Sequence, residues 1–322
     1  MDKNLSYYLQ KFCKLRVDRS RGIAPHKPIL LLSVIELVEQ GLLRKNMIFL
    51  SVELVATFLK YWDNLGSESH RSDIALPFFH MSSEGFWHLK PKPGFESVIS
   101  SKVKLRTIIA LRDAVQYAYL DEQLFDLLQA PLARSNLVNI LTNAWFHDKR
   151  QQIENLFQIN AFQNLQNYLM GKGGVVYKVE ELADESRAVV RDAAFRKIIV
   201  SIYDYRCALC GLQVINSLNQ SIVDGAHIKP FSKFYDDRID NGISLCKNHH
   251  WAFDRGWFTI DDDYTLLVSN DLREESPNAK PLRDSQGEHI ILPVKKQYHP
   301  RIEAITWHRE NVFNRSEQLN LY

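Results

Sequence analysis

The sequence predicts an α+β protein of two domains, and three observations lead to this prediction. Residues 1–165 contain several segments with helical hydrophobic periodicity and one aromatic stretch with the pattern of a β-hairpin. A glycine-rich stretch, MGKGGVV, follows at 170–176. Beyond it, three of the four cysteines and a histidine form two closely spaced pairs, which is typical of a domain held by a metal.

A chain of 322 residues is long enough for two hydrophobic cores. We therefore expect a first domain at 1–165, a linker at 166–185 and a second domain at 186–322. Hydrophobic residues make up 45% and charged residues 24%, as in ordinary globular proteins. The sequence contains no run of eighteen apolar residues, so it predicts no membrane span. The first twenty residues lack the apolar core of a secretory signal.

The first domain is predicted to be mostly helical. The segment 29–43 is apolar nearly all round, so we expect it to be the central buried helix. The segment 74–93 predicts a β-hairpin with Gly85 at its turn, and Pro77 makes its first strand an edge strand. The other predicted helices lie at 5–17, 51–65, 104–120, 121–130, 135–146 and 148–169.

The second domain begins with a predicted helix at 180–204. Residues 257–270 have the alternation of a strand pair joined by acidic turn residues. A short strand at 291–294 and a closing helix at 299–313 complete the predicted elements.

Two residues separate Cys207 from Cys210, and two separate Cys246 from His249. This spacing lets both side chains of each pair face one ion, and four N/S ligands suit tetrahedral zinc. We therefore expect a structural Zn²⁺ that supplies the folding energy of a segment too short to bury its own core. Cysteines kept as metal ligands also favour a reducing compartment, so we expect a cytoplasmic protein.

Between and beside these pairs stand His227, Asn241 and His250. This order inside a metal-stapled segment resembles the HNH nucleases. The resemblance implies a β-hairpin followed by a helix, the ββα-metal fold. It also implies that His227 is the general base that deprotonates water, since a neutral imidazole has a suitable pKa.

In the same resemblance, Asn241 holds the hairpin loop and His250 binds a catalytic divalent cation, Mg²⁺ or Mn²⁺. Many HNH nucleases carry an acidic metal ligand directly before the first histidine, where this chain has Ala226. Asp224, three residues before His227, is the candidate second ligand. Asp254 is expected to have a structural role.

The stretches 25–35 and 75–89 resemble the sulfur-binding domain of McrA-like, modification-dependent (type IV) restriction endonucleases. That resemblance implies binding of phosphorothioate-modified double-stranded DNA. Sulfur is larger and softer than the oxygen it replaces, so a shallow apolar cup favours it. The cup would consist of Leu76, Pro77 and Phe78.

The charge of the phosphate would be held by His26 and Lys27 at the N-terminus of the predicted central helix. Contacts to the DNA backbone or to base edges are expected from Arg19, Arg21 and Arg71. The net charge is only +2, but residues 1–30 contain seven basic and two acidic residues. That local excess is compatible with phosphate binding and also with a solvated helix face.

The predicted function is a type IV restriction endonuclease for phosphorothioate DNA. One alternative is an HNH endonuclease directed at another mark, such as a methylated base. Another is a zinc-stapled DNA-binding regulator without catalysis, although such a regulator has no need of a general base. Because one HNH site cuts one strand, a homodimer is expected.

Overall fold

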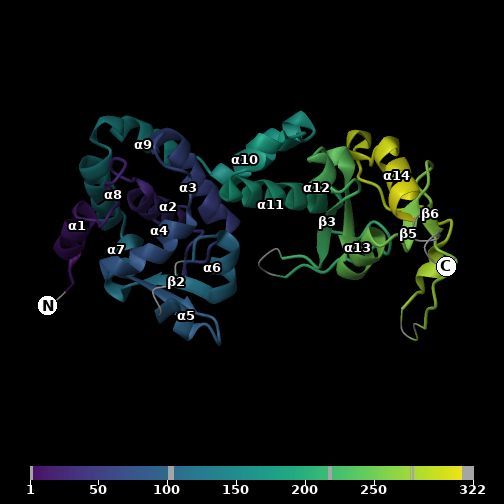
Figure 1. Ribbon diagram of the computed structural model, residues 1–322, viewed down its shortest axis with the longest axis horizontal. Helices are drawn as coiled ribbons and strands as arrows, with labels where there is room; N and C mark the ends of the chain where they lie inside the picture. Colours follow the sequence, from purple (N-terminus) through teal and green to yellow (C-terminus); the bar gives the residue numbers. More distant parts are fainter. Residues whose placement is uncertain (1–2, 101–104, 217–219, 276, 278, 314–322) are drawn as a thin grey trace. The chain divides into compact units, whose positions relative to one another are not determined.

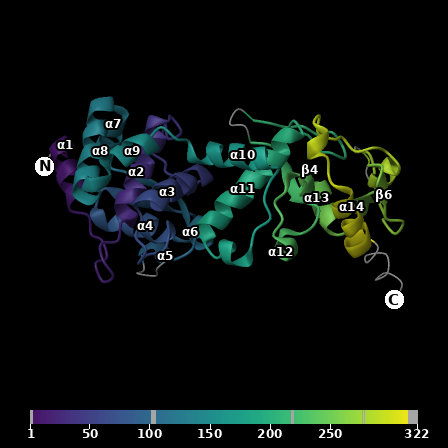
Figure 2. The ribbon, with the colours of Figure 1, turned by 90° about the horizontal axis from the view of Figure 1, so that it is seen from above.

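The structure is a computed structural model that describes residues 3–100, 105–216, 220–275, 277 and 279–313. It divides into two compact units, shown as ribbons in Figure 1 and Figure 2. Unit 1 comprises Met1–Asn164 and Leu182–Val190, and unit 2 comprises Leu165–Glu181 and Arg191–Tyr322. The segment 166–185, predicted as a linker, is therefore shared between the two units.

Unit 1 is mostly helical, as predicted. Its elements are α1 (Leu5–Cys13), α2 (His26–Glu39), α3 (Val52–Leu65), α4 (Ala75–His80), the 3₁₀ turn η1 (Met81–Glu84), β1 (Trp87–Pro91), α5 (Glu96–Ser100), α6 (Ile108–Ala114), β2 (Val115–Leu120), α7 (Glu122–Gln129), α8 (Pro131–Trp145), the 3₁₀ turn η2 (His147–Lys149) and α9 (Arg150–Leu156). Helices α10 (Ala161–Lys172) and α11 (Glu185–Ile202) each span the division between the units.

The predicted central helix is confirmed. Twelve of the fourteen residues of α2 are buried, and the helix packs against α3, α4, α7 and α8. One of the buried residues is Glu36, whose carboxylate accepts hydrogen bonds from Lys60 Nζ and Tyr61 Oη at 2.6 Å each. Because the carboxylate is paired, a charge is tolerated inside this apolar core.

The predicted hairpin at 74–93 is wrong in its first strand. Residues 75–80 form α4, because Asp73 Oδ1 accepts hydrogen bonds from the amides of Ala75 and Leu76 and Pro77 suits a first helical turn. The second predicted strand does form, as β1. It pairs in antiparallel fashion with β2, and Trp87 lies opposite Leu120.

Two predicted helices are also corrected. In the segment 104–120, whose first residue lies outside the described residues, the helix α6 ends at Ala114 and β2 follows at once. The alternating sequence VQYAYL suits a strand better than a helix. The predicted helix at 148–169 is divided into α9 and α10 by a break at residues 157–160.

Unit 2 is built around a short antiparallel hairpin and the helix that follows it. Its further elements are the 3₁₀ turn η3 (Val179–Leu182, whose last residue belongs to unit 1), β3 (Val223–His227), α12 (Phe231–Phe234), the 3₁₀ turn η4 (Ile239–Asn241), β4 (Gly242–Cys246), α13 (Lys247–Asp254), β5 (Phe258–Ile260), β6 (Leu266–Val268), the 3₁₀ turns η5 (Leu282–Ser285) and η6 (Lys296–Tyr298), α14 (Ile302–His308) and the π turn η7 (Arg309–Phe313).

Strands β3 and β4 pair so that His227 lies opposite Gly242, and α13 follows β4 directly. Gly242 is needed because a Cβ atom there would collide with Ile199 of α11, which packs against the hairpin. The predicted strand pair at 257–270 and the closing helix are confirmed by β5, β6 and α14. The strand predicted at 291–294 does not form, since Pro293 has no N–H for a ladder.

The glycine-rich stretch predicted as a linker packs closely within unit 2. The amide of Asp237 donates to Val175 O at 2.9 Å, and the amide of Ile239 donates to Gly173 O at 2.9 Å. Gly174 has φ +90°, and a Cβ atom at this position would collide with the backbone of Asp237 and Arg238. The glycines therefore permit two backbone segments to approach each other rather than making this stretch a free tether.

Within the described part of the chain, none of the helices combines the length and the apolarity that crossing a membrane requires.

Candidate functional site

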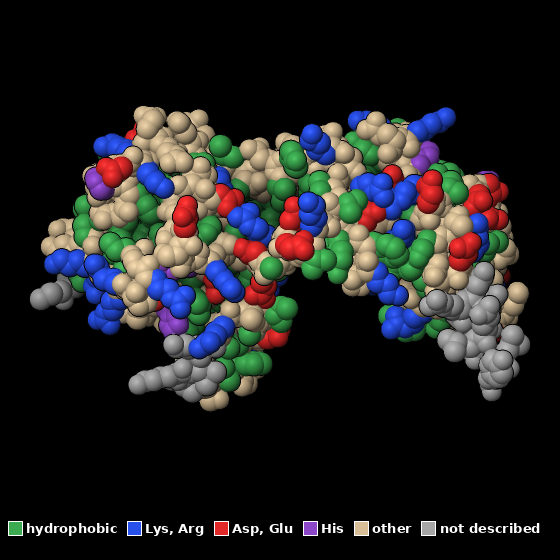
Figure 3. Space-filling view, turned by 45° about the horizontal axis from the view of Figure 1, so that its top comes forward, with side chains coloured by type: hydrophobic (Ala, Val, Ile, Leu, Met, Phe, Trp, Pro, Cys, Tyr) green, Lys and Arg blue, Asp and Glu red, His purple; other side chains and the backbone are tan. Residues whose placement is uncertain are grey.

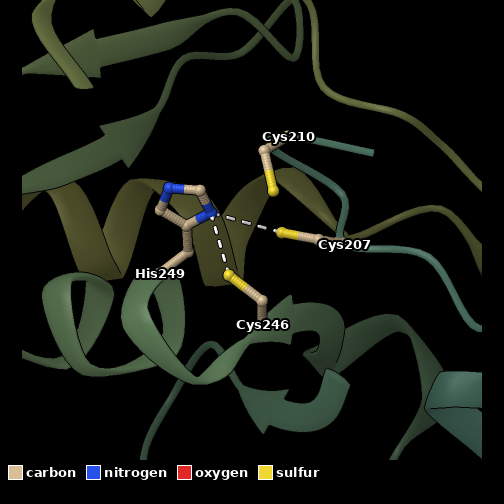
Figure 4. A group of neighbouring side chains, drawn as sticks. All are labelled: Cys207, Cys210, Cys246 and His249. Carbon is tan, nitrogen blue, oxygen red and sulfur yellow. Dashed lines mark hydrogen bonds between the residues drawn. The ribbon is translucent and has the colours of Figure 1, made fainter. Parts of the chain in front are cut away.

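The two Cys/His pairs of unit 2 come together as predicted. The ligand atoms of Cys207, Cys210, Cys246 and His249 all lie within 4.8 Å of one another, and their side chains point toward a common centre (Figure 4). His249 Nδ1 lies 3.4 Å from Cys207 Sγ and 3.3 Å from Cys246 Sγ. Tetrahedral zinc with ordinary bond lengths places S and N ligands about 3.5 Å apart, so the donor set and its spacing fit a metal.

This cluster joins the end of β4 and the start of α13 to the segment that follows α11. Cys207 lies in the segment that follows α11, Cys246 ends β4, and His249 is in the first turn of α13. Cys207 is fully buried and Cys246 nearly so. Hydrogen bonds from Cys207, Cys210 and His249 lower the pKa of the Cys246 thiol, so this sulfur favours the thiolate form that binds metal.

His227, at the end of β3, makes a hydrogen bond that determines its tautomer. Its Nε2 lies 2.7 Å from Asp237 Oδ1, and its ring stacks on Phe195 with centroids 3.9 Å apart and planes at 4°. Asp237 also accepts from Arg191 Nη1 at 2.7 Å. Because the carboxylate accepts this bond, the uncharged form of the ring carries its proton on Nε2 and keeps the lone pair on Nδ1. The geometry therefore leaves Nδ1 as the basic atom of His227.

Asn241, which precedes β4, is fully buried, and its side-chain amide forms hydrogen bonds to backbone atoms. Its Oδ1 accepts from the amide of Lys229 at 3.0 Å, and its Nδ2 donates to Lys229 O and to Asp236 O at 3.1 and 2.9 Å. These bonds hold together the two ends of the segment between β3 and β4. His227 lies just before this segment and Asp237 lies within it, so Asn241 holds the backbone next to both residues.

The C-terminal helix holds the same segment from outside. Arg301, just before α14, donates to Asp236 Oδ2 at 2.5 Å and to Asp240 Oδ1 at 2.6 Å. Its own amide donates to Asp240 O at 2.9 Å. Although burial raises the pKa of Asp236, hydrogen bonds from Arg238 and Arg301 outweigh burial and keep that pKa below its usual range.

Asp224 and His250 form a second polar group. His250 Nδ1 lies 3.9 Å from Asp224 Oδ2, and Lys247 Nζ pairs with the same carboxylate. The nearby ring of His250, together with Lys247 and Arg196, holds the pKa of Asp224 well below its usual range despite partial burial. His250 Nε2 also lies 3.7 Å from Asp254 Oδ2. The predicted pair of Asp224 and His250 is thus brought together, and Asp254 contacts it.

Asp224 and His227 are three residues apart on β3, and successive side chains of a strand point to opposite faces. In agreement, the contacts described above for His227 are with Phe195 and Asp237, whereas those of Asp224 are with Lys247 and His250. The predicted nuclease residues therefore form two groups, one on each face of β3.

Unit 1 contains a pocket of about 980 Å³ that gathers most of the predicted DNA-reading residues. Figure 3 shows Lys and Arg side chains grouped on the surface of this unit. The predicted residues that line the pocket are Arg21, His26, Lys27, Arg71, Leu76 and Pro77. Arg16, His70 and Arg106 also line it and were not predicted. The pocket thus combines an apolar patch at α4 with several cations and with the carboxylates of Asp18, Glu68 and Asp73.

Two of the predicted residues lie elsewhere. Phe78 is 1% exposed and packs edge-on against Trp87 with centroids 5.3 Å apart, so it belongs to the core. It faces away because it follows Pro77 on the helix α4 instead of sharing a strand face with Leu76. Arg19 lines a separate pocket of about 370 Å³ beside Trp145 and His147.

The two residues predicted to hold the phosphate charge already have partners. Lys27 is 7% exposed and forms an ion pair with the buried Glu84 and a hydrogen bond to Ser83 Oγ at 3.0 Å. His26 Nε2 lies 2.8 Å from Arg71 O, and its ring lies on Trp62 with centroids 4.5 Å apart. Burial lowers the pKa of His26, with a further contribution from His70, which favours the neutral ring.

Sequence reasoning missed Asp237, Arg191, Arg301 and Glu84. The acidic run at 236–240 is visible in the sequence, but its distance from His227 follows no periodicity that predicts a contact. Arg301 lies sixty residues beyond Asn241, and Glu84 lies 57 residues beyond Lys27. Such contacts depend on tertiary packing, and no local motif signals them.

Comparison with known families identifies both parts of the chain. Residues 6–158 match the family described as the ScoMcrA-like DNA sulfur-binding domain, and residues 207–261 match a family of HNH endonucleases. Both resemblances predicted from the sequence are thereby confirmed. No curated protein matches the chain significantly.

Three solved structures resemble parts of the chain. A modification-dependent TagI restriction endonuclease is 24% identical with a TM-score of 0.29, and the match covers 38% of this chain but only 39% of that one. The sulfur-binding domain of SprMcrA complexed with phosphorothioated DNA is 19% identical, with a TM-score of 0.35 and coverages of 44% and 86%.

The type IV phosphorothioation-dependent restriction endonuclease ScoMcrA is 11% identical with a TM-score of 0.35, and the match covers 76% of this chain and 94% of that one. At these identities and TM-scores, all three are distant structural relatives. It is the two family matches that identify the domains.

Proposed function

Since the chain joins a ScoMcrA-like DNA sulfur-binding domain to an HNH endonuclease domain, we propose that it is a modification-dependent (type IV) restriction endonuclease. Unit 1 binds phosphorothioate-modified double-stranded DNA, and unit 2 hydrolyses a phosphodiester bond. The presence of both domain families on one chain is the observation that carries the proposal. A non-catalytic regulator accounts for less, because it leaves the base His227 without a use. An HNH endonuclease for a methylated base also accounts for less, because it leaves the match to a DNA sulfur-binding domain without a use.

His227 is the general base of the proposed hydrolysis. Its Nδ1 accepts a proton from the attacking water, and the positive charge that forms on the ring is stabilised by Asp237 at 2.7 Å from Nε2. Phe195 holds the ring plane, and Arg191 holds Asp237 in place. Asp237 is a positioning residue here, since it acts on the reaction through His227.

Asp224 and His250 are the residues that would hold the catalytic cation, Mg²⁺ or Mn²⁺. One carboxylate oxygen and one ring nitrogen at 3.9 Å suit a cation that takes its other ligands from water and phosphate. When bound, such a cation neutralises charge on the scissile phosphate and on the leaving oxygen. Lys247 is paired with the same carboxylate, so the cation would take the place that its ammonium holds.

Zinc is the proposed occupant of the Cys207, Cys210, Cys246 and His249 cluster. Three thiolates and one imidazole are soft and borderline ligands, and all four positions of a tetrahedron are taken by protein atoms. A closed ligand set leaves no position for water or substrate. The ion is therefore proposed to staple the hairpin to α13 and to take no part in the chemistry.

The pocket of unit 1 is the proposed reader of the phosphorothioate. Leu76 and Pro77 offer the apolar surface that suits sulfur better than a hydrated oxygen. With Lys27 neutralised by Glu84, the phosphate charge falls to Arg16, Arg21, Arg71 and Arg106. His26 orients the segment of Arg71 through its bond to Arg71 O.

Cutting both strands with one HNH site per chain takes either two copies or two successive nicks, and we propose that it is done by a homodimer on DNA. We place the protein in the cytoplasm, where thiolate metal ligands stay reduced.

The decisive test compares full-length protein on duplexes that differ in one phosphorothioate of defined stereochemistry. The expected result is Mg²⁺- or Mn²⁺-dependent cleavage of the modified duplex and little or none of the unmodified one. Binding is measured in parallel with the His227→Ala variant, which is expected to bind without cutting. Equal cleavage of both duplexes contradicts the sulfur specificity and leaves a nuclease directed at another mark. Absence of cleavage of any modified DNA contradicts the nuclease assignment.

A further inference from the structure

Two tryptophans are exposed at the surface of the HNH domain. Trp251 is 47% exposed and Trp257 is 40% exposed, although large aromatic side chains are usually buried. Their rings contact each other edge to face, with centroids 4.9 Å apart and planes at 85°. These two indoles are not part of the buried core of unit 2. Exposed aromatic side chains that lie together often mark a binding surface.

The backbone that carries the pair is rigid. Trp251 lies within α13, one residue after His250. Trp257 follows Gly256, which has φ +68° and whose Cβ would collide with Val312 O. The amide of Trp257 donates to Ala252 O at 3.0 Å, and its carbonyl accepts from Ser269 at 2.9 Å. The indoles are therefore presented on a fixed support and need little ordering to bind a partner.

A cation accompanies the pair. The guanidinium of Arg255 lies 3.8 Å above the ring of Trp251, and Arg255 has no carboxylate partner in the part of the chain that the structure describes. Lys247 lies one helical turn before Trp251 on α13. Aromatic faces beside positive charges suit a partner that combines flat bases with phosphates, which is a nucleic acid.

We propose that Trp251 and Trp257 form a stacking surface for a nucleobase of the substrate DNA next to the cut, with Arg255 at a neighbouring phosphate. This inference rests on the proposed function, in which His250 is at the scissile phosphate. Lys247, which pairs with Asp224 of that site, shares a helix face with Trp251 four residues later, so DNA held there lies near this face of α13. Aromatic side chains that contact or enter the base stack hold and distort DNA in this way, and they do not require a particular base.

The test uses the full-length chain and a double variant, Trp251→Ala with Trp257→Ala, on a cleavable duplex. Loss of one base–aromatic stack corresponds to roughly a 5- to 150-fold loss in affinity, so KM is expected to rise by at least fivefold. The double variant Trp251→Phe with Trp257→Phe keeps aromatic faces and is expected to stay within a few-fold of wild type. Val294→Ser is the matched control, since Val294 is 98% exposed in the same unit.

A spectroscopic readout locates the contact. With 2-aminopurine placed beside the cut, wild-type protein is expected to change its fluorescence on binding, and the Ala double variant is not. Metal content and circular dichroism of each variant show whether unit 2 remains folded. If the Ala variant does not fold, the Phe variant with the same probe decides, because a retained signal supports stacking and a lost one contradicts it.

Three outcomes overturn the inference. The first is an unchanged KM together with an unchanged 2-aminopurine signal in a folded Ala variant, while the wild type still cuts. In that case the stacking surface is refuted and the proposed function stands. A lower mass of the Ala variant in sedimentation without DNA shows that the pair lies between protein copies. Failure of the wild type to cut any modified DNA removes the proposed function itself.

Discussion

The pocket of unit 1 and the metal-stapled hairpin of unit 2 are assembled in opposite ways. The pocket draws residues from positions 16 to 106, held by helix packing and by pairs such as Lys27 with Glu84. The hairpin site lies within 207–254, apart from Arg191, Phe195 and Arg301. Recognition thus depends on the shape of a hydrophobic core, whereas the chemistry depends on a local staple. The two functions are expected to fail under different conditions.

Metal removal should give the largest difference between the regions. Structural zinc contributes on the order of 10 kcal/mol or more to the folding of such segments, so a chelator should unfold the hairpin and abolish cutting. Unit 1 has no part in the cluster and should still bind modified DNA. Circular dichroism, cleavage and DNA binding are measured before and after chelation, with Cys210→Ser as an independent way to weaken the site. Loss of binding together with cutting would show that the regions are not independent.

His227→Ala should separate cutting from binding. Removal of a general base typically lowers the rate by about 10²- to 10⁴-fold, and the side chain lies far from the residues of the unit 1 pocket in the chain. Single-turnover cleavage and DNA affinity are measured on the same preparation. Asp237→Asn should lower the rate by less, because the amide oxygen can still accept from Nε2 and only the negative charge beside the ring is lost. Cutting at the wild-type rate by His227→Ala would refute the mechanism.

Acid should weaken unit 2 through His308. Burial lowers the pKa of His308 to about 4, while Thr259 and Phe253 O hold its neutral ring at 2.9 and 3.0 Å. The unfolded chain takes up this proton near pH 6.5 and the folded chain does not. Stability is therefore full above pH 6.5 and falls as the pH drops toward 4, by about 3 kcal/mol in all.

The measurement is urea unfolding of wild type and His308→Gln between pH 7.5 and 5. Metal loss in acid affects both proteins equally, so the difference between their slopes reports His308. Equal slopes would show that this side chain does not control the acid sensitivity of unit 2.

The smallest expected effect is in the pocket. Leu76→Ser replaces apolar surface by a hydroxyl that suits oxygen better than sulfur. At roughly 25 cal/mol per Å², losing about 40 Å² of apolar contact amounts to about 1 kcal/mol, or roughly a fivefold loss of preference for sulfur. Affinities for modified and unmodified duplexes are compared in the His227→Ala background. Leu132→Ser is the control, because Leu132 is exposed in the same unit and does not line the pocket.

The same contrast explains what sequence reasoning achieved. Cys207, Cys210, Cys246 and His249 were predictable because the spacing within each pair nearly determines its geometry. The hairpin at 74–93 was not, because an aromatic run beside Gly85 satisfies a strand pattern locally while the Asp73 cap and tertiary packing make α4. Lys27 was assigned to phosphate because its position is visible in the sequence and its partner Glu84 is not.

The contact of Arg301 with Asp236 and Asp240 has a consequence for the order of synthesis. The loop that carries Asp237 and Asn241 leaves the ribosome sixty residues before Arg301 does. At about 5–20 residues per second, this interval lasts roughly 3 to 12 s. During that time unit 1, the proposed DNA reader, is already complete, and unit 2, the proposed nuclease, still lacks this clamp. A nascent or C-terminally truncated chain should therefore recognise DNA before it is able to damage it.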